Sequence, residues 1–223
     1  MNEKLIKERL NDPKVTLVAV TKKHSKEEVD EQYRLGVRTF GENRVQEFLE
    51  KYDPNYTWHI IGHLQTNKVK YVVGKVAMIE SVDSKKLAAQ IEKEAAKQNL
   101  VQDILIEVKV SKTDETKTGL PPEELDDLLA YCDTLEHVRV RGLMTIASLN
   151  QPEEVNREEF TLLHSLFEKH KANRPDFEYL SMGMSHDYKL AIACGSNMVR
   201  IGTALLRTPD HGVLFCERTS LIL

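Results

Sequence analysis

Residues 16–22, Thr-Leu-Val-Ala-Val-Thr-Lys, form the stretch that decides the fold of this 223-residue chain. An apolar run of this kind is typical of a strand in a parallel sheet, where both faces of the sheet are buried. The run ends at Lys22, where a buried strand would reach the surface. We therefore expect the first strand of a parallel sheet here, with an amine at its carboxyl end.

Seven further strand-like runs follow, and charged stretches with helical periodicity separate them. The predicted strands are residues 16–21, 38–41, 58–62, 77–82, 103–110, 139–146, 178–182 and 198–202. The predicted helices are residues 3–10, 26–35, 43–52, 66–74, 84–98, 122–134, 153–171 and 186–194. This alternation predicts an α/β fold, a (β/α)8 TIM-type barrel with an extra N-terminal helix, as one domain over residues 1–223. A doubly wound open sheet is the alternative.

The composition is that of an ordinary soluble globular protein, with 41% hydrophobic and 30% charged residues. Lys and Arg total 31 against 35 Asp and Glu, and no long block of one sign predicts a nucleic-acid surface. No apolar segment is long enough for a membrane span or resembles a signal peptide, so we expect a cytoplasmic protein. The histidines and Cys132, Cys194 and Cys216 lack metal-ligand spacing, and we interpret the cysteines as reduced packing residues.

Two glycine-containing segments near the end of the sequence predict an anion-binding site. Residues 181–185, Ser-Met-Gly-Met-Ser, precede the predicted helix 186–194, and Gly202-Thr203 follows the last strand, where barrels of this class hold phosphate groups. The hydroxyls of Ser185 and Thr203 add possible donors. The alternative is that Ser185 caps a helix and Gly202 forms a turn.

An amine at one strand end and a phosphate cradle at another suggest a site for pyridoxal 5'-phosphate (PLP). A lysine amine forms a Schiff base with an aldehyde when its surroundings leave part of it neutral. For Lys22, the alternative is a solvated strand end without chemical function.

Arg200 lies two residues before Gly202, so the alternation of side chains along a strand places both on the same side. A guanidinium that faces a pyridine nitrogen would leave that nitrogen unprotonated and weaken the ring as an electron sink. The alternative is that Arg200 pairs with a carboxylate of the barrel, such as Glu42 or Asp83.

Other candidate residues have simpler explanations. His59 and His63 are conceivable proton-transfer groups, but a packing or capping role is preferred, and Trp58 is expected in the core. Lys117 lies in a charged loop after the fifth strand and is a further candidate amine above the barrel.

Seven motifs occur in one order along nearly the whole chain and carry a resemblance to a known family. They are AVTK at 19–22, GENRVQE at 41–47, WHIIGHLQTNK at 58–68, SVDS at 81–84, GLMT at 142–145, LSMGMS at 180–185 with Asp187, and VRIGT at 199–203. The sequence resembles the pyridoxal phosphate homeostasis protein family, the single-domain relatives of the alanine racemase barrel known as the YggS or PROSC type.

The resemblance implies specific roles for six residues. Lys22 would carry PLP as a Schiff base, Arg200 would face the pyridine nitrogen and Asn43 would line the same pocket. The phosphate would be held by Ser185, Gly202 and Thr203. Family members are regarded as cofactor carriers or regulators without robust turnover.

We therefore expect a PLP homeostasis protein with no catalytic residues and no second domain, monomeric, with recipient apoenzymes as possible partners. Two alternatives stay open: a PLP-dependent amino-acid racemase of low activity, and a barrel that binds a different phosphorylated metabolite.

The sequence departs from the family pattern at two places. Lys109 stands where the family tends to have an asparagine in the fifth strand, and Leu205-Leu206-Arg207 replaces the usual phenylalanine-glycine after the last strand. Neither departure falls on a proposed cofactor ligand. The tail, residues 208–223, has no place in the family pattern, and we expect it to pack across the barrel or to be mobile.

Overall fold

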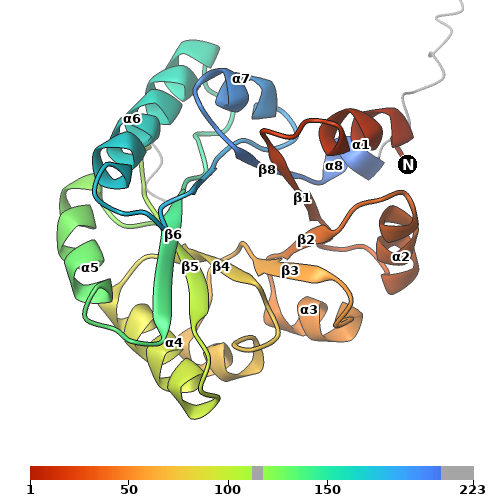
Figure 1. The fold of residues 1–223 in the computed structure, drawn as a ribbon. Helices are drawn as coiled ribbons and strands as arrows, with labels where there is room; N and C mark the ends of the chain where they lie inside the picture. The colour runs from red at the N-terminus through yellow and green to blue at the C-terminus, as the bar shows by residue number, and fades with distance from the viewer. Residues whose placement is uncertain (112–117, 207–223) are drawn as a thin grey trace, which may run out of the picture.

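The fold is a closed barrel of eight parallel strands with helices around its outside (Figure 1), seen in a computed structural model that describes residues 1–111 and 118–206. The strands are β1 (Thr16–Val20), β2 (Thr39–Glu42), β3 (Thr57–Ile60), β4 (Met78–Val82), β5 (Gln102–Glu107), β6 (Val138–Met144), β7 (Tyr179–Ser181) and β8 (Met198–Ile201). They pair in sequence order, and β8 pairs with β1. The predicted TIM-type barrel is confirmed, and the open-sheet alternative is wrong.

The helices lie close to where the sequence predicts them, and the differences concern helix type and one added helix. They are α1 (Glu3–Leu10), α2 (Lys26–Arg34), α3 (Val45–Lys51), α4 (Lys85–Lys97), α5 (Leu125–Cys132), α6 (Glu153–Lys171), α7 (Tyr188–Ala193) and α8 (Thr203–Leu206), with the 3-10 helices η1 (Thr66–Tyr71) and η2 (Pro122–Glu124). The α-helix predicted over 66–74 is the 3-10 helix η1, because apolar residues three apart suit either helix type. The short α8 was not predicted.

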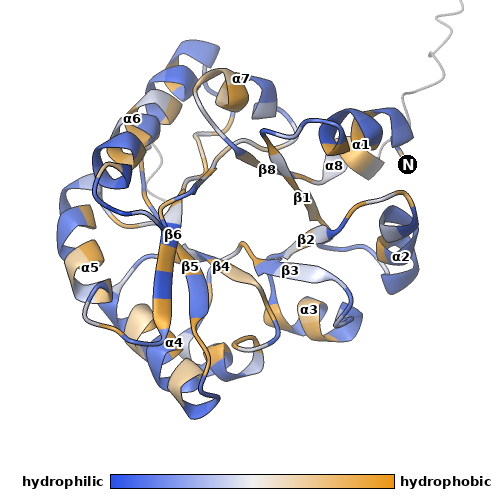
Figure 2. Ribbon diagram, in the orientation of Figure 1, coloured by the Kyte–Doolittle hydropathy of each residue, from blue (hydrophilic) through white to orange (hydrophobic). Residues whose placement is uncertain are grey.

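Apolar side chains form two separate cores. The larger core lies between the barrel and the surrounding helices and includes Trp58, as expected from the sequence. Figure 2 shows these helices carrying apolar residues beside hydrophilic ones, the pattern of helices that pack on one side only. The smaller core fills the barrel itself with Val18, Val20, Ile61, Met78, Leu105, Met144 and Met198. The barrel is therefore a packed scaffold, and chemistry is confined to its rim and to polar residues inside it.

The residue that caps the N-terminal helix is bonded to the segment after the last strand. Asn2 donates its backbone N–H to Leu205 O at 2.7 Å and its side-chain amide to Ala204 O at 3.2 Å. Figure 1 shows α1 and α8 side by side. This contact fixes the segment that follows β8, where the sequence predicts part of an anion site.

Some predictions concern residues outside the described part of the chain. They are Lys117, Cys216 and the tail over 208–223. Across residues 1–111 and 118–206, none of the helices has the length and apolar character needed to cross a membrane.

Candidate functional site

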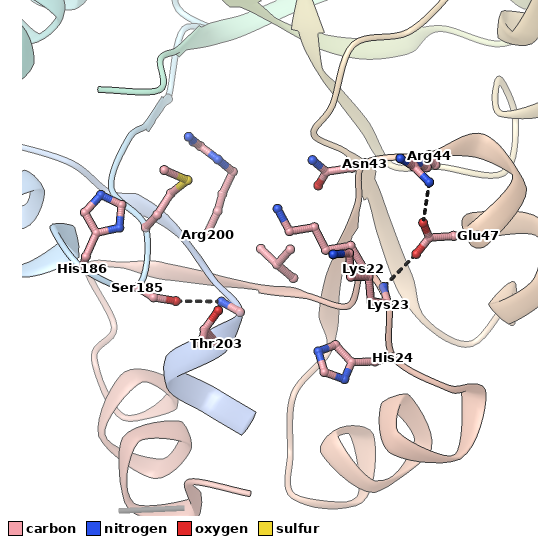
Figure 3. A pocket seen from close by; sticks show the side chains of 13 residues that line it. Lys22, Lys23, His24, Asn43, Arg44, Glu47, Ser185, His186, Arg200 and Thr203 are labelled. Carbon is pink, nitrogen blue, oxygen red and sulfur yellow. Dashed lines mark hydrogen bonds and ion pairs between the residues drawn. The ribbon is translucent and has the colours of Figure 1, made fainter. Parts of the chain in front are cut away.

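A cavity of about 600 Å³ opens at the carboxyl ends of β1, β2 and β8. All six residues predicted from the sequence line it: Lys22, Asn43, Ser185, Arg200, Gly202 and Thr203. Figure 3 shows Lys22 and Asn43 on one side of the cavity and Ser185, Arg200 and Thr203 on the other. The other lining residues were not predicted from the sequence: Val20, Lys23, His24, Arg44, Glu47, Met184 and His186. The volume is in the range of small-molecule sites.

The turn that carries Lys22 has an unusual backbone. The next residue, Lys23, has a φ of +65°, in the left-handed region that disfavours residues with a side chain. Its N–H donates to Glu47 Oε2 at 2.8 Å. This hydrogen bond, together with the positive charge of Lys51, holds the pKa of Glu47 below its usual value. A carboxylate of α3 thus stabilises the turn in this shape.

Behind the same turn lies a buried ion pair. Lys51 Nζ donates to Glu42 Oε1 at 2.6 Å and to the carbonyl oxygen of Thr21 at 2.7 Å. The hydroxyl of Thr21 donates to the same carboxylate at 2.7 Å. The pair fixes the residue before Lys22 and occupies Glu42, which was predicted as a possible partner of Arg200.

The opposite side of the cavity brings backbone donors together. The N–H groups of Gly202 and Ala204 both donate to Ser185 Oγ at 3.2 Å. Arg200 N–H donates to Gly183 O at 3.0 Å and joins the two segments. The two glycine-containing segments predicted to form an anion site therefore meet in space. A Cβ at Gly202 would lie 3.2 Å from Val20 Cβ, so a side chain there would crowd this wall of the cavity.

Arg200 is only 3% exposed and is held by groups inside the barrel. Its Nη1 donates to Ser181 Oγ at 2.6 Å and its Nη2 to Thr145 O at 2.7 Å. The carboxylate beside it is Glu80, at 3.8 Å from Nη1. The alternative that Arg200 pairs with a carboxylate of the barrel therefore holds, but the carboxylate is Glu80 and neither Glu42 nor Asp83, the two examples named from the sequence. Burial lowers the pKa of the Arg200 guanidinium, and the charge of Glu80 opposes that effect.

The two candidate histidines are not brought into the cavity. His59 is buried, and its Nδ1 lies 2.7 Å from Glu80 Oε1, which confirms the packed role preferred from the sequence. His63 is exposed and does not line the cavity, nor does Asp83. The groups in the cavity that can react with or bind a ligand are the amines of two lysines, two guanidinium groups, two imidazoles, one carboxylate, one side-chain amide and two hydroxyls: Lys22, Lys23, Arg44, Arg200, His24, His186, Glu47, Asn43, Ser185 and Thr203.

This set of groups fits a ligand that carries an aldehyde and a phosphate. An exposed lysine amine can attack a carbonyl, and amides at a glycine turn bind phosphate oxygens. The cationic residues Lys22, Lys23, Arg44 and Arg200 favour a dianion over a neutral ligand, with Glu47 as the carboxylate among the lining residues.

Comparison with known proteins identifies the family of the chain. The family described as "Alanine racemase, N-terminal domain" matches residues 1–208. A pyridoxal phosphate homeostasis protein from Aquifex aeolicus is 48% identical over 195 residues, which cover 85% of each chain. The protein of that name from Pasteurella multocida is 38% identical over 205 residues, covering 88% of each chain.

Solved structures with a similar fold include proteins of the same family. PipY from Synechococcus elongatus, solved without PLP, superposes with a TM-score of 0.85 at 35% identity, covering 92% of this chain and 99% of PipY. The PipY structure with PLP bound gives 0.82 at 34% identity, covering 91% and 100%. An alanine racemase from Clostridium difficile 630 shares the fold at 14% identity, with a TM-score of 0.71 over 94% of this chain and 56% of the racemase. The chain therefore belongs to the pyridoxal phosphate homeostasis protein family, built on the barrel of the alanine racemase N-terminal domain.

Proposed function

We propose that this protein binds PLP in the cavity at the ends of β1, β2 and β8 and serves intracellular PLP homeostasis. It carries the cofactor as a Schiff base on Lys22, without robust catalysis. The observation that carries the proposal is the meeting of the Lys22 amine, the Arg200 guanidinium and the Ser185–Gly202 segment around one cavity. The PLP-bound structure of PipY supports the choice of ligand.

Each residue has a distinct task in this proposal. Lys22 would hold the cofactor through its amine, which can condense with an aldehyde and release water. Ser185, Gly202 and Thr203 bind the phosphate, Arg200 faces the ring nitrogen, and Asn43 lines the pocket. When bound, PLP supplies an electron-withdrawing ring, and a guanidinium that donates to its nitrogen reduces that effect. A site of this kind favours retention of the cofactor over turnover.

The test is covalent trapping. The protein mixed with PLP should show the visible absorption of a Schiff base, and borohydride reduction followed by peptide mapping should place the adduct on Lys22. Lys22→Ala should lose both signals. Lys23→Ala is the matched control, because Lys23 is the neighbouring amine in the same cavity, and it should keep the adduct. An adduct on Lys23, or a colourless wild-type protein that does not bind PLP, overturns the proposal.

A low-activity amino-acid racemase is the second candidate, and one observation favours it. His24 and His186 line the cavity and offer a base besides Lys22. Exchange of the Cα hydrogen of an amino acid with solvent deuterium separates the two functions. Exchange at background rate supports a carrier, and exchange that Lys22→Ala abolishes supports the racemase.

The cellular setting follows from the same proposal. We propose a monomeric cytoplasmic carrier that delivers PLP to recipient apoenzymes. Transfer is measured by mixing the PLP-loaded protein with a PLP-free enzyme and following recovery of that enzyme's activity.

A further inference from the structure

Four buried side chains from four strands form a continuous hydrogen-bonded chain inside the barrel. His59 Nδ1 on β3 lies 2.7 Å from Glu80 Oε1 on β4, and Ser181 Oγ on β7 donates to Glu80 Oε2 at 2.6 Å. Arg200 Nη1 on β8 in turn donates to Ser181 Oγ at 2.6 Å. Their exposures are 4%, 0%, 0% and 3% in the order His59, Glu80, Ser181, Arg200. Of these residues, only Arg200 lines the cavity.

Glu80 is the carboxylate that most directly balances the charge of Arg200. Two other acidic residues contribute more weakly: Glu107 on β5 and Asp187 before α7. Burial raises the pKa of Glu107, although Thr118 donates a hydrogen bond to it at 2.7 Å. Asp187 accepts the N–H of Met184 at 2.6 Å and lies 3.2 Å from His186 Nε2. Glu80 is bonded to both His59 and Ser181, and these hydrogen bonds hold its pKa below the usual value against the effect of burial.

We propose that Glu80 is a positioning residue for the cofactor site: through Ser181 it fixes the orientation of the Arg200 guanidinium and compensates its charge. This inference rests on the proposed function, since it concerns how the floor of the PLP site is held. The physical reason is that a guanidinium without a counter-charge in a dry interior is costly. Ser181 accepts a hydrogen bond from the Arg200 guanidinium and donates one to the Glu80 carboxylate, so it holds these two side chains relative to each other.

The chain offers a matched control for this arrangement. Ser148 Oγ donates to Glu159 Oε1 at 2.7 Å, and both residues are buried, at 1% and 6% exposed. Neither of them lines the cavity. Both pairs are a buried serine that donates to a buried glutamate, but only the pair Ser181–Glu80 contacts Arg200.

The experiment compares Glu80→Gln and Ser181→Ala with the controls Glu159→Gln and Ser148→Ala. For each variant, the affinity for PLP is measured by absorbance titration. The pH at which the protonated Schiff base on Lys22 loses its proton is followed by its visible band.

Glu80→Gln should lower that midpoint by about one pH unit, because an uncompensated Arg200 charge disfavours a second cation nearby. Ser181→Ala keeps both charges, so it should leave the midpoint in place and weaken PLP binding about fivefold or more by loosening Arg200.

The controls should match wild type in both measurements. A folded Glu80→Gln with an unchanged midpoint, or Ser181→Ala with unchanged affinity, overturns the proposal, as do controls that shift as much as their counterparts. If Glu80→Gln does not fold, the affinity of Ser181→Ala decides alone. Failure of the wild-type protein to bind PLP is a separate result that rejects the proposed function itself.

Discussion

The backbone N–H of Lys23 donates to Glu47 Oε2 at 2.8 Å, so a side chain of α3 holds the turn that follows β1. Lys23 has a left-handed backbone there, and Glu47 compensates for that strain with a charge-assisted hydrogen bond. The candidate Schiff-base residue precedes Lys23 in the same turn. The contact therefore stabilises the turn that carries the proposed Schiff-base residue.

Glu47→Gln should destabilise the protein by about 1 kcal/mol at pH 7, because the glutamine oxygen still accepts from the Lys23 N–H but carries no charge. The pKa of Glu47 is lowered on folding, so the stabilisation is present above its unfolded value near 4.5. It is lost as the pH falls through the lower folded value. Urea unfolding of the wild type and of Glu47→Gln should show a difference in the free energy of unfolding at pH 7 that is smaller at pH 3. Glu50→Gln, at an exposed residue of the same helix, is the control, and its free energy of unfolding should match that of the wild type at both pH values.

Ser185→Ala should weaken PLP binding about tenfold, because it removes the hydroxyl that organises the amides of Gly202 and Ala204. Absorbance titrations with PLP and with pyridoxal, which lacks the phosphate, separate the causes. The loss should appear with PLP and be small with pyridoxal. An equal loss with both ligands would show that Ser185 does not act through the phosphate. Ser165→Ala, on an exposed residue of α6, serves as the control.

The barrel could be predicted from the sequence because each strand is a short apolar run that ends in polar residues. Parallel strands that alternate with helices must then point their carboxyl ends to one rim. For the same reason Lys22, Asn43 and Arg200 could be expected at one site, and they do line one cavity. Their roles toward PLP stay predictions.

The partner of Arg200 could not be predicted in the same way. Glu80 lies in the middle of a buried strand, and the pairing of β4 with β5 shifts register between Ile79 and Val82. Sequence spacing says which residues share a strand face, but not which side chains meet across the interior of a barrel. Glu47 was also missed, because its contact is with a backbone N–H whose availability depends on the left-handed turn at Lys23.

Cys132 should be unreactive in the folded protein. Burial raises the pKa of its thiol to about 12, so almost none of the reactive thiolate is present near neutral pH. Iodoacetamide at pH 8 should leave the Cys132 peptide unmodified in native buffer and alkylate it in urea, as seen by mass spectrometry. Equal labelling rates in the two conditions would mean that this part of α5 opens readily.

The buried pair of Lys51 and Glu42 predicts a large and asymmetric mutational effect. Lys51→Met should cost about 3–5 kcal/mol of folding stability, because it leaves the Glu42 carboxylate buried without its cation. Adding Glu42→Gln should recover part of that loss, since the double variant buries no uncompensated charge. Urea unfolding at pH 7 measures both.

Lys97→Met is the comparison, because Lys97 is 56% exposed in its ion pair with Glu94 and its loss should cost less than about 1 kcal/mol. A Lys51→Met cost no larger than that of Lys97→Met would mean that water reaches Glu42. The turn that carries Lys22 would then be held by two backbone N–H groups rather than by the ion pair: that of Lys23, which donates to Glu47, and that of Thr21, which donates to Gly41 O on β2.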